Sequence, residues 1–147
     1  AYTDDPASHW ITRPVTGRLL GETHGMIYIY TIYGIHRCLN FTSDSQAPGA
    51  VLIRAIEPVN GMAMMQQRRG ITDIRNLTNG PGKLVQAMGI DASLNGRSVC
   101  DHLPMTRSER IDDRRIGTSP RIGISKGKSL PWRFFIKDNP FVSRRRG

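Results

Sequence analysis

Hydrophobic and polar residues alternate most regularly over residues 26–41. The period of two runs from Ile27 to Ile32 and resumes from Ile35 to Phe41, and most of the side chains involved are aromatic or β-branched. Such a pattern is typical of β-strands. Tyr33-Gly34 interrupts the alternation, and a glycine relieves the backbone of a tight turn. The sequence therefore predicts a β-hairpin with Tyr33 at its tip.

Shorter patterns predict the other elements. We expect strands at residues 50–56, 121–125 and 132–137, and helices at residues 60–69 and 80–89. In the second helix Pro81 suits the first turn and Gly89 suits the end, while Leu84, Val85 and Met88 would pack inward. Residues 101–120 are mostly polar or charged and are predicted to be irregular. The predicted fold class is α+β: a single domain over residues 1–147, with a curved, mostly antiparallel sheet, a protruding β-hairpin and a few helices.

The chain is strongly basic. It holds 21 Lys and Arg against 12 Asp and Glu, which gives a net charge of +9, and 17 of the basic residues are arginine. The planar guanidinium group pairs in a bidentate way with phosphate, so nucleic acid is the first partner to expect and an anionic membrane surface the second. No uncharged run near the aromatic residues is long enough to span a membrane, and we expect no membrane segment.

The cysteines and histidines do not indicate a cofactor. Cys38 and Cys100 lack the CxxC spacing of zinc sites, and the four histidines form no HExxH pair. A glycine-rich phosphate loop of the GxxxxGK type is also absent from the sequence. We therefore expect two buried thiols in a reducing compartment, no metal site and no cofactor.

Two features indicate where the chemistry lies. All four tyrosines fall within the first 33 residues, which suggests an aromatic pocket or platform; the alternative is that Tyr28 and Tyr30 are ordinary half-buried residues of a sheet. Tyr33, beside a glycine at a hairpin tip, would be exposed and able to wedge between bases. Arg54 lies inside an apolar strand and needs a partner other than Glu57, which strand parity places on the opposite face; the alternative is an edge strand from which Arg54 reaches water.

Six motifs in one order resemble a known family. They are Ala1-Tyr2 with His9, Tyr30-x-x-Tyr33-Gly34, Cys38-Leu39-Asn40, the run from Leu52 to Pro58, Gly80-Pro81-Gly82-Lys83-Leu84, and Pro140-Phe141-Val142-Ser143. Together they are similar to the alkyladenine (3-methyladenine) DNA glycosylases over nearly the whole chain. The resemblance implies an enzyme of base-excision repair that flips alkylated or deaminated purines out of duplex DNA and hydrolyses the N-glycosidic bond with water, without a lyase step.

The same resemblance implies roles for individual residues. Tyr2 on one side, with His9 and Tyr30 on the other, would sandwich the flipped base, and Asn40 would exclude the amino group of guanine. Tyr33 would fill the space that the base leaves. Contacts with the DNA backbone would come from the amides of Gly34, Ile35 and His36, from Lys83, and from the stretch that holds Arg13, Thr16 and Arg18. Each of the charged residues in this set could instead be an ordinary solvated surface charge.

The general base is the point at which this sequence departs from the family pattern. By resemblance it is a glutamate directly before Ala1, and Arg54 would orient it; Asp4 and Asp5 match no position of the base. The chain as given is therefore expected to lack the family's N-terminal segment and to be inactive. One alternative is a non-catalytic module that binds damaged DNA, and another is a basic nucleic-acid protein such as a ribosomal one. The expected partner is duplex DNA with damaged purines, bound by a monomer in the bacterial cytoplasm or in a eukaryotic nucleus.

Overall fold

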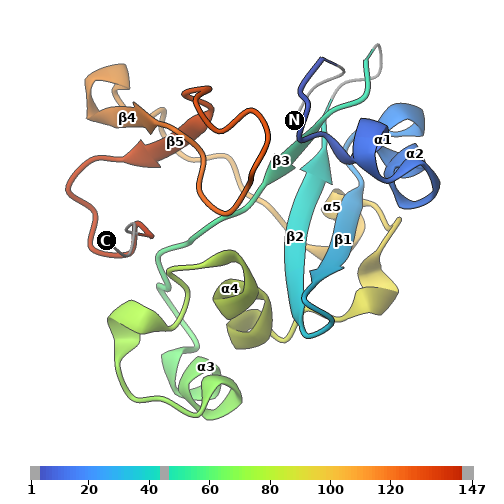
Figure 1. Cartoon of the computed structure of the whole chain (residues 1–147). Coiled ribbons are helices and arrows are strands. Elements are labelled where there is room, and N and C mark those ends of the chain that lie inside the picture. The colour runs from blue at the N-terminus through green and yellow to red at the C-terminus, as the bar shows by residue number, and fades with distance from the viewer. Residues whose placement is uncertain (1–3, 44–46, 144–147) are drawn as a thin grey trace.

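The computed structural model describes residues 4–43 and 47–143, with the side chain of Thr16 excepted, and it confirms an α+β fold with antiparallel sheets (Figure 1). The first elements are α1 (His9–Thr12) and α2 (Pro14–Glu22), followed by β1 (Ile27–Ile32), β2 (His36–Thr42) and β3 (Ala50–Leu52). Next come α3 (Met62–Arg69), η1 (Ile74–Asn76), α4 (Pro81–Met88), η2 (Ala92–Leu94) and α5 (Val99–His102). The chain then forms η3 (Asp113–Arg115), β4 (Ile116–Ser119) and β5 (Arg133–Ile136).

The main sheet has three antiparallel strands in the order β1-β2-β3. The predicted hairpin is confirmed, with Ile29 opposite Leu39 and with Tyr33 and Gly34 in the turn at φ angles of 53° and 72°. The third strand is shorter than predicted and ends at Leu52. Beyond it the Ile53 amide still donates to the Leu39 carbonyl of β2 at 3.0 Å, and farther along the carbonyl of Ile56 accepts from the Thr78 hydroxyl at 2.6 Å.

A separate two-stranded sheet is formed by β4 and β5. The strand predicted at residues 132–137 is confirmed as β5, but the one predicted at 121–125 is wrong, and its partner β4 lies in the stretch predicted to be irregular. The side chain of Arg121 is drawn instead into hydrogen bonds with Asp5 and with the carbonyl of Gly127. A four-residue strand next to charged residues is too short to reveal itself by its period.

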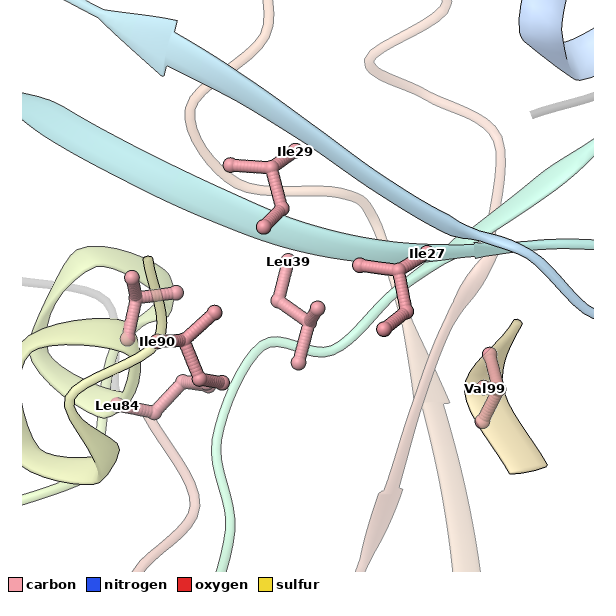
Figure 2. Packing of buried hydrophobic residues seen from close by; sticks show 7 residues of the cluster. Ile27, Ile29, Leu39, Leu84, Ile90 and Val99 are labelled. Carbon is pink, nitrogen blue, oxygen red and sulfur yellow. The ribbon is translucent and has the colours of Figure 1, made fainter. Parts of the chain in front are cut away.

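The two faces of the hairpin pack against different layers. Ile27, Ile29 and Leu39 point toward α4 and α5 and form the core that Figure 2 shows, together with Leu84, Val85, Ile90 and Val99. Tyr28 and Tyr30 point to the opposite face, where Leu19, Leu20 and Ala50 pack against them. The alternation of isoleucine and tyrosine along β1 therefore separates the core from a second face that is rich in aromatic residues.

The helices confirm most of the sequence prediction. Helix α4 begins at Pro81 and is followed by Gly89 as its C-cap, as predicted, but its inward residues are Leu84, Val85 and Ala87, while Met88 is 37% exposed. Met88 is the last residue of the helix and lies at the edge of its buried stripe. Only one of the two thiols is buried, because Cys100 is exposed on the short helix α5. In the described residues no helix has the length and the apolar character that a membrane crossing needs.

Candidate active site

A pocket of about 470 Å³ opens on the tyrosine face of the main sheet. Its walls come from three parts of the chain: the N-terminal stretch and α2, the main sheet and residues 52–54, and the segment from residue 121 to 134. The lining residues are Ala7, His9, Leu20, Tyr28, Tyr30, Asn40, Ala50, Val51, Leu52, Arg54, Arg121, Ile122, Ile124, Trp132, Arg133 and Phe134. The pocket therefore brings together four predicted site residues, His9, Tyr30, Asn40 and Arg54. Tyr2 lies outside the described residues.

His9 forms the aromatic corner of the pocket. Its Nδ1 lies 2.9 Å from the Tyr28 hydroxyl, and its ring meets the Tyr30 ring edge to face at a centroid distance of 4.3 Å. Burial, together with the positive charge of Arg13, lowers the pKa of His9 from 6.5 to about 4. The imidazole is therefore neutral at physiological pH.

Tyr30 completes this corner and is also neutral. Burial raises the pKa of its hydroxyl, and a hydrogen bond with the Cys38 thiol adds to the effect. The exposed Arg13 guanidinium lies over the Tyr30 ring, 5.5 Å from its centroid. The structure thus places Arg13 next to one of the residues that line the pocket.

Asn40 is held rigidly. Its side chain is 5% exposed, and Nδ2 donates to the carbonyl of Tyr28 at 3.0 Å and to that of Cys38 at 3.3 Å. Because both of these acceptors are backbone atoms of the hairpin, the amide cannot turn aside without losing buried hydrogen bonds. A ligand that reaches Asn40 therefore meets a fixed surface.

Arg54 is half-buried and bonded to the C-terminal part of the chain. Its Nε donates to Ser143 Oγ at 2.9 Å and its Nη1 to the carbonyl of Ile122 at 3.3 Å. Glu57 is not its partner and accepts instead from Asn139. Burial and the neighbouring Arg133 lower the pKa of Arg54, and a guanidinium nevertheless keeps its charge. Arg54 therefore holds a fixed positive charge at the pocket, rather than reaching out to water.

The hairpin tip lies at the far end of the strands from α1. Tyr33 is 88% exposed and Ile35 74% exposed, and the Ile35 amide donates to the carbonyl of Ile32 at 3.3 Å. A side chain in place of Gly82 would come within 3.3 Å of His36, so the first turn of α4 packs closely against the tip end of the hairpin. The next residue, Lys83, donates from Nζ to Asn79 at 2.7 Å.

The chain is similar to known proteins over nearly its whole length. A family model described as methylpurine-DNA glycosylase (MPG) matches residues 1–140. The chain belongs to this glycosylase family. A relative from Nitrosospira multiformis is 45% identical over 96% of this chain and 74% of its own length. Relatives from Chlorobium phaeobacteroides, at 38% identity over 97% and 74%, and from Methanoculleus marisnigri, at 42% over 96% and 77%, are similar. All three carry the name "Putative 3-methyladenine DNA glycosylase".

The sequence did not reveal the C-terminal wall of this glycosylase's pocket. Four residues form it: Arg121, Ile122, Ile124 and Trp132. The short stretch that starts at Arg121 alternates like a strand, and nothing local shows that its arginine pairs with a carboxylate 116 positions away. The last motif that carries the family resemblance, Pro140-Phe141-Val142-Ser143, begins after this wall and so gave no information about it.

The two N-terminal aspartates differ in environment. Asp4 is exposed, whereas Asp5 is completely buried and forms a bidentate pair with Arg121 at 2.5 and 2.8 Å. Burial raises the pKa of Asp5, but the hydrogen bonds from Arg121 and from the Ala7 amide outweigh it, so its pKa is lower than usual. A carboxylate that is paired in this way is a poor proton acceptor, which supports the interpretation that Asp5 is not the general base.

Proposed function

We propose that this chain is a DNA repair glycosylase that flips a damaged purine into the pocket and hydrolyses its N-glycosidic bond with water. The observation that carries the proposal is the combination, in one pocket, of a neutral aromatic corner with the fixed amide of Asn40. A volume of about 470 Å³ lies in the range of small-molecule sites. A base stacked in a duplex is out of reach of any such pocket, so the nucleotide must be extruded first.

The neutral corner suits an alkylated purine. Alkylation at N3 or N7 gives the base a positive charge, and aromatic rings attract cations through the negative potential of their faces. Because His9 keeps a pKa of about 4, it adds no charge that would repel such a base. Deaminated bases such as hypoxanthine and etheno bases such as ethenoadenine would fit the same corner as neutral rings and depend more on hydrogen bonds.

Asn40 accounts for the rejection of normal guanine. Its side chain is fixed by the carbonyls of Tyr28 and Cys38 and cannot withdraw. The exocyclic amino group of guanine would meet it, whereas hypoxanthine and 3-methyladenine carry no group at that position. Selectivity thus comes from a steric conflict with the wrong base as well as from contacts with the right one.

The chemical step needs one carboxylate. A water molecule attacks C1′, the N-glycosidic bond breaks with its electron pair going to the departing base, and the carboxylate takes the proton of the water. By resemblance the carboxylate is a glutamate directly before Ala1, which Arg54 would orient. In the described part of the chain no lysine lines the pocket. The proposed reaction is hydrolysis alone, without strand cleavage.

Duplex DNA would approach along the hairpin. Tyr33, exposed at the tip, would occupy the gap that the flipped nucleotide leaves, and Lys83 and Arg13 would contact phosphates on either side. The amides of Gly34 and His36 would contribute at the tip, while that of Ile35 already donates within the turn. Thr16, in α2, is proposed as a further contact with the DNA backbone. One copy of the chain suffices for this arrangement.

The test is base release from a short duplex that contains one hypoxanthine. The 147-residue chain is compared with versions that carry either glutamate or glutamine directly before Ala1. Release by the glutamate version, with a large loss in the glutamine version, supports the proposal. Tight binding to the lesion without release by any version would favour a non-catalytic binding module instead, and equal binding to damaged and undamaged duplex would refute both.

A further inference from the structure

The pocket is closed by parts of the chain that are far apart in the sequence. Ala7 and His9 line it from the N-terminal stretch and α1, and Ile122, Ile124 and Trp132 line it from the segment between β4 and β5. The segment between β4 and β5 that carries the second group contains no helix or strand. Figure 1 shows this segment, in orange, beside the dark-blue N-terminal stretch. Side-chain contacts, rather than a regular backbone ladder, must therefore set the width of the pocket.

One ion pair, between Asp5 and Arg121, joins these two parts of the chain. Arg121 holds Asp5 with two hydrogen bonds, and its Nη2 also donates to the carbonyl of Gly127 at 2.8 Å. Its guanidinium lies 5.2 Å from the ring centroid of Trp132. The side chains of the pair are 0% and 15% exposed, whereas every other ion pair between described residues has both side chains at least 42% exposed. A buried, bidentate pair of this kind fixes geometry in a way that exposed pairs do not.

The loop is shaped around this pair. Gly127 has a φ of 57°, and a Cβ built there would lie 2.6 Å from Arg121 Nη2 and 3.1 Å from Asp5 Oδ1. Only a glycine combines that backbone angle with so close an approach. The Gly127 carbonyl also accepts from the Leu130 amide at 3.3 Å, so the turn of the loop and the ion pair share one acceptor.

We propose that Asp5 and Arg121 are positioning residues, which hold the 121–132 wall at the separation from His9 that a flipped purine requires. This inference rests on the proposed function of the pocket. Arg121 fixes the loop from inside through Gly127 and Trp132, and Asp5 ties that assembly to the chain two residues before Ala7. Loss of the pair would leave DNA contacts at the hairpin tip intact and would loosen the pocket alone.

The test measures the binding ratio between two short duplexes that are identical except for hypoxanthine or adenine at one position. Asp5→Asn keeps the shape and removes the charge. The double variant Asp5→Leu/Arg121→Met replaces the pair with apolar side chains, an exchange that buried ion pairs often tolerate without loss of stability. Asp113→Asn, which breaks the exposed pair with Arg110, is the matched control.

Both pocket variants should lose the preference for hypoxanthine, so that the ratio of the dissociation constants for the two duplexes falls toward one. Their affinity for the adenine duplex should stay unchanged, whereas a general loss of folding would lower it. The control variant should bind both duplexes with the affinity of the wild type. If Asp5→Asn does not fold, the binding ratio of the double variant is the result that tests the inference. Retention of the wild-type ratio in a folded pocket variant overturns this inference. A wild type without any preference would instead refute the proposed function.

Discussion

Removing the ring of Tyr33 should separate binding to duplex from binding to single strands. Tyr33 is 88% exposed and has a φ of 53°, a left-handed angle that asparagine adopts more readily than most residues. Tyr33→Asn therefore deletes the ring without straining the turn, and the free energy of unfolding should change by no more than about 0.5 kcal/mol.

The expected loss of affinity follows from the stacking that the ring would provide. Stacking of a base on an aromatic side chain contributes about 1–3 kcal/mol, which corresponds to roughly 5- to 150-fold in the dissociation constant. A duplex from which a nucleotide has been flipped has a gap to fill, and a single strand has none. The loss should therefore appear on a hypoxanthine duplex and be nearly absent on the same strand alone.

The assay is fluorescence anisotropy at one fixed salt concentration, because phosphate contacts make every DNA affinity depend on salt. Tyr33→Phe serves as the matched control, since it keeps the ring and loses only the hydroxyl, and it should bind like the wild type. Equal losses on duplex and single strand in Tyr33→Asn would refute the wedge role and leave the tip as a general DNA contact.

Three other predictions concern the pocket and the core. Asn40→Ser should lower the ratio of the affinity for a hypoxanthine duplex to that for a guanine duplex, measured with two duplexes that differ only at that base. His9 has a folded pKa of about 4 against 6.5 when free, so its contribution to stability is complete above pH 6.5 and lost as the pH falls toward about 4; thermal unfolding of His9→Phe should lack this dependence. Leu84→Ala, fully buried, should cost about 2–5 kcal/mol, and Met88→Ala far less.

The hairpin could be predicted because its signals are local. The alternation along β1 specifies the strand and the face on which Tyr28 and Tyr30 lie, and Tyr33-Gly34 specifies the turn. None of these signals depends on the rest of the chain. Helix α4 was predictable for the same reason, since a proline at its start and a glycine after its end act on neighbouring backbone alone. Met88 was wrongly predicted to pack inward because periodicity shows which face of a helix is buried but not how wide that buried face is.

The C-terminal half of the site could not be predicted in this way. Residues 121–125 alternate as a strand would, yet the hydrogen bonds of Arg121 go to Asp5 and Gly127. A partner so distant in the sequence leaves no trace in a local pattern. The partners of Arg54 are of the same kind: strand parity correctly excluded Glu57, but it could not point to Ser143 or to the carbonyl of Ile122.

The contact between Asp5 and Arg121 also bears on the order in which the molecule assembles. The hairpin closes over a few residues and can form early, whereas a contact 116 residues apart must wait for the slow closure of nearly the whole chain. The hairpin tip should therefore be native while the pocket is still open. In a refolding experiment on a Trp10→Phe background, the fluorescence of Trp132 should reach its final value after β-sheet ellipticity does. During synthesis, a chain that has not yet reached residue 121 should therefore contain the hairpin but not the pocket.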